Sequence, residues 1–95
     1  MNEGHIYLKF DGATTRLAGN PYGRTVFEKQ AKTKMNYEGK TVIEFPSQIE
    51  NIASSFVQGF FAEIIAEIGK SEFCNRIEIQ GSPKIVNKIM RSLGI

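Results

Sequence analysis

Residues 41–69 read TVIEFPSQIENIASSFVQGFFAEIIAEIG, and this stretch decides the fold. Its first part is a short β-favouring run, Val42 to Phe45, which Pro46 ends. From residue 56 the apolar residues recur at helical spacing and form one wide face. That face comprises Phe56, Val57, Phe60, Phe61, Ile64, Ile65 and Ile68. Gly69 stands where a glycine commonly ends a helix. We therefore predict a central strand followed by a core helix over residues 55–68.

The length and composition bound the class of protein. The chain of 95 residues is 41% hydrophobic and 23% charged, which predicts one domain, residues 1–95, of ordinary soluble composition. The net charge of +2 argues against nucleic acid, whose protein partners usually carry a clustered basic face. Cys74 has no second cysteine to pair with, which fits a reducing compartment. We find neither a run of the roughly 20 apolar residues that spans a membrane nor the pattern of a signal peptide, so we expect a cytoplasmic protein.

The first part of the chain predicts a hairpin. Residues 5–10 alternate between apolar and polar side chains, and the Asp-Gly pair at 11–12 follows at once. Asp-Gly between alternating runs is a strong signal for a tight turn between two strands. We predict the return strand over residues 13–18, with Thr15 and Leu17 on its inner face.

A helix is predicted next, over residues 21–34. Asn20 is placed as its N-cap and Pro21 at its first helical position. Its inward residues are predicted to be Tyr22, Val26, Phe27 and Ala31. Its outer face is basic, with Arg24, Lys29, Lys32 and Lys34.

The last part of the chain predicts a link over residues 70–75, a strand over 76–80 and a final helix. Ile77 and Ile79 alternate with polar residues in the strand. Ser82 is predicted to cap the helix, with Pro83 in its first turn. The apolar stripe of this helix is Ile85, Val86, Ile89, Met90 and Leu93, and Gly94 closes it.

The order of these elements predicts an α/β two-layer sandwich. Most of the strands have one apolar and one polar face, whereas a parallel sheet covered on both sides would be apolar throughout. Right-handed crossovers that step the same way place the helices on one side of the sheet. We therefore predict a mixed four-stranded sheet, a β-hairpin followed by βα repeats, with three helices mainly on one face. The open face is predicted to carry Tyr7, Lys9, Arg16, Glu44 and Glu78.

The sequence names no catalytic set, cofactor site or metal site. His5 lies near a chain end and is most simply a solvated residue. Cys74 has no second thiol and no nearby histidine for thiol chemistry or metal binding. The glycine-rich run at 19–24 lacks the Gly-Lys-Ser/Thr ending of a phosphate loop. We therefore expect a protein that is not an enzyme.

Two serines at the head of the core helix allow two interpretations. Ser55 with Gln58 matches the capping box, in which the two side chains satisfy unpaired backbone amides. A hydroxyl at a helix start is also well placed to carry phosphate, because free amides and the helix dipole stabilise the added charge. The structural interpretation is the simpler one.

A stripe of small residues lies opposite the apolar face of the core helix. It comprises Ser55, Gly59, Ala62 and Ala66. Glycine in mid-helix costs about 1 kcal/mol relative to alanine, so Gly59 needs a reason. We hypothesise a docking surface that another helix or backbone approaches closely. Gly59→Leu is then expected to abolish partner binding without lowering stability.

The units VIEF at 42–45, IENIASSFVQGFFAEII at 49–65 and RIEIQG at 76–81, followed by an amphipathic helix, resemble the STAS-like family. This bacterial family is related to the anti-sigma factor antagonists. The resemblance covers residues 20–95 and implies a cytoplasmic signalling switch or adaptor that binds a protein partner, in the best-known relatives an ATPase-type kinase. In those relatives the helix begins Asp-Ser-Ser/Thr-Gly and its first serine is phosphorylated. The matching positions here are Ala53, Ser54, Ser55 and Phe56, so the resemblance points to Ser54 while the aspartate and glycine are absent.

Three functions stay open at this point. The first is a protein-interaction module, a monomer or weak dimer, that binds through the start and outer stripe of the core helix. Its predicted contact residues are Ser54, Ser55, Gln58, Gly59, Ala62 and Glu63. The second is a nucleic-acid accessory protein that uses the basic helix 21–34. The third, ranked lowest, is a small enzyme, which would need a pocket with convergent polar groups.

Overall fold

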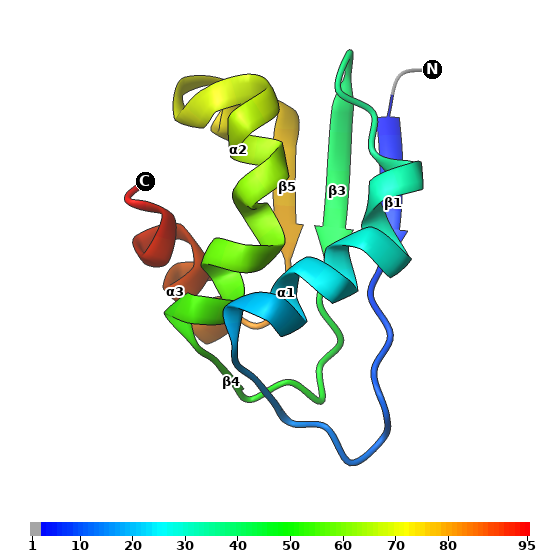
Figure 1. The fold of residues 1–95 in the computed structure, drawn as a ribbon, viewed down its shortest axis with the longest axis vertical. Helices are drawn as coiled ribbons and strands as arrows, with labels where there is room; N and C mark the ends of the chain where they lie inside the picture. Colours follow the sequence, from blue (N-terminus) through cyan, green and yellow to red (C-terminus); the bar gives the residue numbers. More distant parts are fainter. Residues whose placement is uncertain (1–2) are drawn as a thin grey trace.

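The computed structural model describes residues 3–95 and has an α/β fold (Figure 1). Within these residues, three parallel strands form one sheet in the order β1-β3-β5, and a second, two-stranded parallel pair lies apart from it. The strands are β1 (Glu3–Tyr7), β2 (Arg16–Leu17), β3 (Lys40–Glu44), β4 (Asn51–Ile52) and β5 (Ile77–Gln80).

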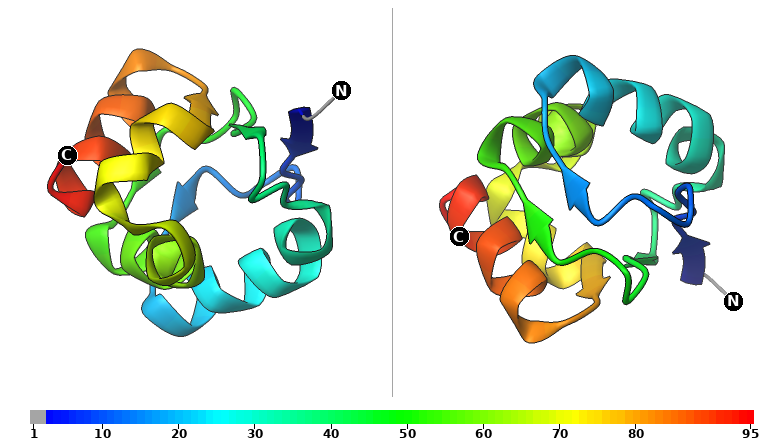
Figure 2. Two further views of the ribbon diagram at one scale, coloured as in Figure 1. Left: turned by 90° about the horizontal axis from the view of Figure 1, so that it is seen from above. Right: turned by 90° about the horizontal axis from the view of Figure 1, so that it is seen from below.

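The helices cover one face of the three-stranded sheet. In Figures 1 and 2, α1 and α2 lie across the same side of the sheet, and α3 lies beside α2 near β5. The predicted helix 21–34 is continuous but changes its geometry along its length, from α1 into a π-helical turn and then a 3₁₀ turn. The bounds are α1 (Asn20–Val26), η1 (Phe27–Ala31), η2 (Lys32–Lys34), α2 (Ser54–Arg76) and α3 (Pro83–Leu93).

Phenylalanine side chains on α2 fill the centre of the core. Phe56, Phe60, Phe61 and Phe73 are all fully buried. The Phe60 ring lies 4.7 Å from that of Phe61 and 5.6 Å from that of Phe27, both in edge-to-face contact. Such pairs contribute about 1 kcal/mol each beyond the burial of their area. The prediction that this segment is the core helix is confirmed by its burial.

The predicted hairpin is wrong, and so is the predicted mixed four-stranded sheet, because the main sheet has three strands that all pair in parallel. Asp11 does start a turn, since the Thr14 amide donates to its carbonyl, but the two flanking runs do not pair with each other. β1 pairs with β3 and β2 pairs with β4, in both cases parallel. The side chain of Gln30 binds both backbone groups of Lys9, at 2.7 and 2.8 Å, where a hairpin partner would bind.

A second glutamine holds the rest of this loop. The Gln48 side-chain amide donates to the carbonyls of Asp11 and Thr14, at 2.7 and 2.8 Å. The chain is thereby carried to β4 instead of folding back on β1. Leu17 is buried as predicted, whereas Thr15 is exposed.

The helical geometry is interrupted at Gly69 as predicted, but a further helical segment follows. Gly69 has φ 77° and ψ 162°, which interrupts the helix. The predicted link over residues 70–75 is instead a further helical segment of α2 that ends at Arg76 and contributes the buried Phe73. The end of the chain is as predicted: the Ser82 hydroxyl accepts the Ile85 amide at 3.4 Å, and Gly94 adopts φ 75° after α3.

The inward residues of helix 21–34 are predicted correctly except at its start. Val26, Phe27 and Ala31 are buried, but Tyr22 is 42% exposed and Gly23 takes the inward position. Asn20 is not the N-cap, because Gly19 occupies that position.

The open face of the sheet carries part of the predicted set. Tyr7 and Glu44 are paired in register across β1 and β3, and Glu78 pairs with Val42 on the same face. The prediction is wrong for Lys9, which follows the end of β1, and for Arg16, which belongs to the separate β2–β4 pair.

The small-residue stripe of α2 lies against α1. A Cβ atom added to Gly59 would overlap the Asn20 carbonyl oxygen and stand 2.9 Å from its carbon. A Cβ atom added to Gly23 would likewise overlap the Phe56 carbonyl oxygen and stand 2.8 Å from the Phe60 nitrogen. The two helices therefore cross backbone to backbone, with a glycine from each at the contact.

We expect Gly59→Ala to lower the free energy of unfolding by about 2 kcal/mol. The overlap with the Asn20 backbone outweighs the roughly 1 kcal/mol that alanine gains in helix propensity. Urea denaturation measures this change. Gly12→Ala is the matched control, because its Cβ would meet nothing within 4 Å. Equal stability of the Gly59 and Gly12 variants would show that the helices do not cross in this way.

Candidate functional site

The first turn of α2 lies beside the end of α3. Ser54 is exposed, and its Oγ lies 3.1 Å from the Oγ of Ser92. One turn further, the Gln58 side-chain amide donates to the Ser92 carbonyl at 2.7 Å. These contacts tie the two helices together while leaving the Ser54 hydroxyl at the surface.

Ser55 and Gln58 do not form the predicted capping box. The N-cap of α2 is Ala53, which makes no side-chain cap bond. The Ser55 hydroxyl accepts the Gly19 amide at 3.0 Å, because the start of α1 lies directly against it. Ser54 and Ser55 thus have different roles, one at the surface next to α3 and one joining α2 to the segment before α1.

The predicted docking stripe is not open to a partner. Gly59 is buried under the Asn20 backbone and Ala62 is partly buried. Glu63 is exposed, but its carboxylate pairs with Lys32 at 3.3 Å. The interpretation of Gly59 as an outward docking position is therefore wrong, since the helix that approaches it closely is α1 of the same chain. The exposed members of the predicted set at the helix start are Ser54, Ser55 and Gln58.

Three adjoining hollows surround the Ser54 end of α2, with volumes of about 370, 240 and 170 Å³. Lys88 lines all three, and Ser54 lines the two larger ones. No carboxylate lines any of them within the described part of the chain. Four cationic side chains contribute to their walls: Arg16, Lys84, Lys88 and Arg91. We refer to these four as the basic cluster.

The basic cluster was not predicted from the sequence, although three of its four members have the spacing of residues on one side of a helix. Lys84, Lys88 and Arg91 are spaced i, i+4 and i+7 and therefore share one side of α3. Arg16 joins them only through the pairing of β2 with β4, which no local pattern indicates. The basic face was predicted on residues 21–34 instead. There Lys32 pairs with Glu63, and Arg24 Nε donates to Asn20 Oδ1 at 3.4 Å.

Polar side chains of the open sheet face bind one another. His5 Nε2 lies 3.2 Å from the Glu44 carboxylate, and the His5 ring stacks on Tyr7 at 4.2 Å. Lys40 pairs with Glu78 at 3.2 Å. The Gln80 side-chain amide and Lys40, both bonded to this carboxylate, hold the pKa of Glu78 below its ordinary value.

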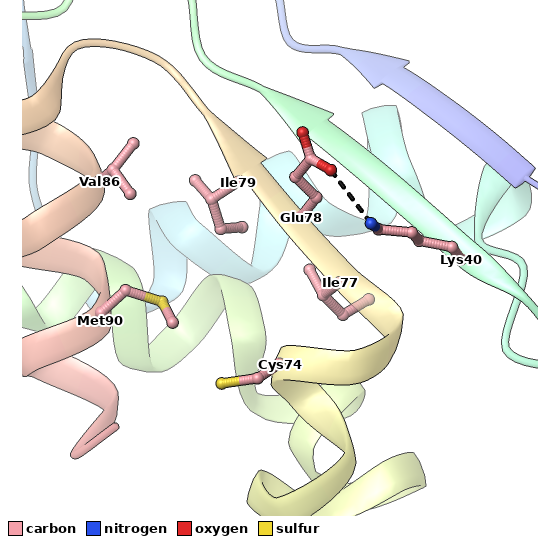
Figure 3. A pocket seen from close by; sticks show the side chains of 7 residues that line it. All are labelled: Lys40, Cys74, Ile77, Glu78, Ile79, Val86 and Met90. Carbon is pink, nitrogen blue, oxygen red and sulfur yellow. Dashed lines mark ion pairs between the residues drawn. The ribbon is translucent and has the colours of Figure 1, made fainter.

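A hollow of about 310 Å³ lies between β5 and α3 (Figure 3). Most of its wall is apolar, and its two charged residues, Lys40 and Glu78, bind each other at one side. The exposed Cys74 lines its lower part in this view. The hollow is lined by Lys40, Cys74, Ile77, Glu78, Ile79, Val86 and Met90. This arrangement resembles a packing gap more than a site for chemistry.

Between residues 4 and 95, no three side chains of the His, Cys, Asp and Glu types come together as a metal site. No helix in the same range has both the length and the apolar character to cross a membrane.

We expect Gln80→Leu to raise the pKa of Glu78, because it removes the hydrogen bond that most favours the carboxylate. A lowered pKa in the folded state contributes stability above the unfolded pKa, and this contribution is lost as pH falls through the folded pKa. The variant should therefore lose less stability on acidification than the wild type. An NMR titration of the Glu78 carboxyl measures the shift, with Gln48→Leu as the control. An unchanged Glu78 titration would contradict this bonding.

Comparison of the chain with protein-family models, with curated proteins and with solved structures found no match. The resemblance to the STAS-like family accordingly rests on the residues themselves, above all those between Val42 and Ile65.

Proposed function

We propose that this chain is a non-enzymatic, cytoplasmic protein-interaction module of the STAS-like kind, which acts as a signalling switch or adaptor. Its contact surface is the exposed start of α2 together with the adjoining end of α3. The proposal keeps Ser54, Ser55 and Gln58 from the predicted contact set and replaces the Gly59 stripe, which α1 covers. The partner is a protein, and the resemblance favours an ATPase-type kinase.

The observation that carries the proposal is the setting of Ser54. Its hydroxyl is exposed at the head of a long helix, and it lines two hollows with Lys88 and no carboxylate. A phosphoryl group added there would meet cationic side chains and the helix dipole, both of which stabilise its charge. Ser55 is less suited, because its oxygen already accepts the Gly19 amide. This supports Ser54 as the phosphorylated serine.

The alternative function is a nucleic-acid accessory protein that uses helix 21–34. Arg24, Lys29 and Lys34 are exposed there and, among residues 4–95, form no ion pair. Three such cations give a weak electrostatic footprint, because affinity for a phosphate backbone grows with the number of phosphates neutralised. We therefore rank this function second.

We expect phosphorylation at Ser54 in the native cell. Intact-mass analysis of the recovered protein should show a fraction carrying one added phosphoryl group. That fraction should disappear in Ser54→Ala and persist in Ser55→Ala. A protein that stays unmodified under conditions that modify a known control substrate would count against the switch, as would a phosphoryl group mapped to another residue.

We also expect partner capture to depend on the first turn of α2. Ser54→Tyr places a bulky side chain on the proposed contact surface, whereas Ala66→Tyr places the same side chain on an exposed position of the same helix away from it. Pull-down from the native cell with the wild type and both variants should lose the partner only for Ser54→Tyr. Retention of the same partner by both variants would show that the contact surface lies elsewhere on the molecule.

A further inference from the structure

The basic cluster joins two elements that are far apart in sequence. Arg16 comes from β2, whereas Lys84, Lys88 and Arg91 come from α3. Seen from below in Figure 2, β4 lies between β2 and α3, and Asn51 and Ile52 of β4 line two of the hollows that the cluster lines. Its hollows run on from one to the next, because Lys88 lines all of them and Arg91 lines two. The result is one continuous cationic surface.

The charges of this cluster form no ion pair within the part of the chain that the structure describes. Among residues 4–95 the ion pairs involve His5, Lys32, Lys40 and Arg76, and none of the four cluster cations. Lys84 and Lys88 also stand one helical turn apart, where like charges repel. Lys88 is half-buried and lines each of the hollows that the other three cations line. An anionic partner would relieve this repulsion.

The lining of the hollows favours a polypeptide over a nucleic acid as that partner. Single-stranded nucleic acids are usually held by aromatic side chains on which bases stack, and no aromatic residue lines these hollows in the described part of the chain. Binding to a duplex usually involves a longer basic stripe than one group of four cations. Besides the cations, the walls contain short polar side chains, Asn51, Ser54 and Ser92, which suit a peptide backbone.

We propose that the basic cluster binds an acidic polypeptide segment of the partner, rich in Asp and Glu. This inference deepens the proposed function and rests on it, because Ser54 lies inside the same surface. Charge complementarity of this kind mainly speeds association and selects the partner, and it weakens with salt. The acidic segment would lie along α3 and end at the first turn of α2.

The test uses a fluorescent, end-capped oligoglutamate peptide and the full chain, with anisotropy read at several salt concentrations. The wild type should bind the peptide with an affinity that falls steeply with salt. The double variant K88Q/R91Q should bind roughly tenfold more weakly, equivalent to about 1.4 kcal/mol. The control K29Q/K34Q removes the same charge from exposed, unpaired lysines of the other basic segment and should bind as the wild type does.

Four outcomes would overturn the inference. They are no binding of the peptide, equal loss in both double variants, tighter binding of a single- or double-stranded oligonucleotide of equal charge, and equal occupancy by inorganic phosphate alone. Two separate readouts distinguish this inference from the proposed function: peptide anisotropy reports on the basic cluster, whereas the intact mass of protein recovered from the native cell reports on Ser54. Failure of peptide binding with Ser54-dependent partner capture intact would reject only the acidic segment. Peptide binding without any Ser54-dependent capture or modification would reject the switch.

Discussion

The contact on which the structure depends is the crossing of α1 over α2 at Gly23 and Gly59. Each glycine faces the backbone of the other helix at a distance that no side chain could occupy. This approach brings Gly19 within hydrogen-bonding distance of Ser55 and places Phe27 against Phe60 in the core. It also covers the small-residue side of α2. The surface left open at the start of α2 is therefore a consequence of how the two helices pack.

The elements with strong periodicity could be predicted from the sequence, and those set by distant side chains could not. The β3, α2, β5 and α3 segments follow from their apolar spacing, and Gly69, Ser82 and Gly94 end or begin helices where their chemistry indicates. The hairpin prediction failed because Asp-Gly is a local signal. Gln30 and Gln48, which bind the loop backbone, lie about 20 and more than 30 residues away and carry no local signature.

The candidate site, like the fold, could be predicted only where local sequence determines it. A serine at the start of the core helix and a reason for Gly59 could both be inferred, since glycine in mid-helix indicates close approach. A single sequence does not show whether the approaching backbone belongs to a partner protein or to the same chain. Here it belongs to α1 of the same chain. The cations of α3 have the spacing of one helix side, but their meeting with Arg16 depends on the β2–β4 pairing, which is a tertiary contact.

The distribution of charge distinguishes the two polar surfaces of the molecule. On the open sheet face, Lys40 forms an ion pair with Glu78, and His5 Nε2 contacts the Glu44 carboxylate, so these groups bind one another. Around α3 the cations have no such partners among the described residues, and like charges on one helix side oppose folding. Functional surfaces commonly carry features that reduce stability. The small net charge of +2 thus conceals a local excess of positive charge beside Ser54. In the proposed function, this uneven distribution, more than the total charge, would select the partner.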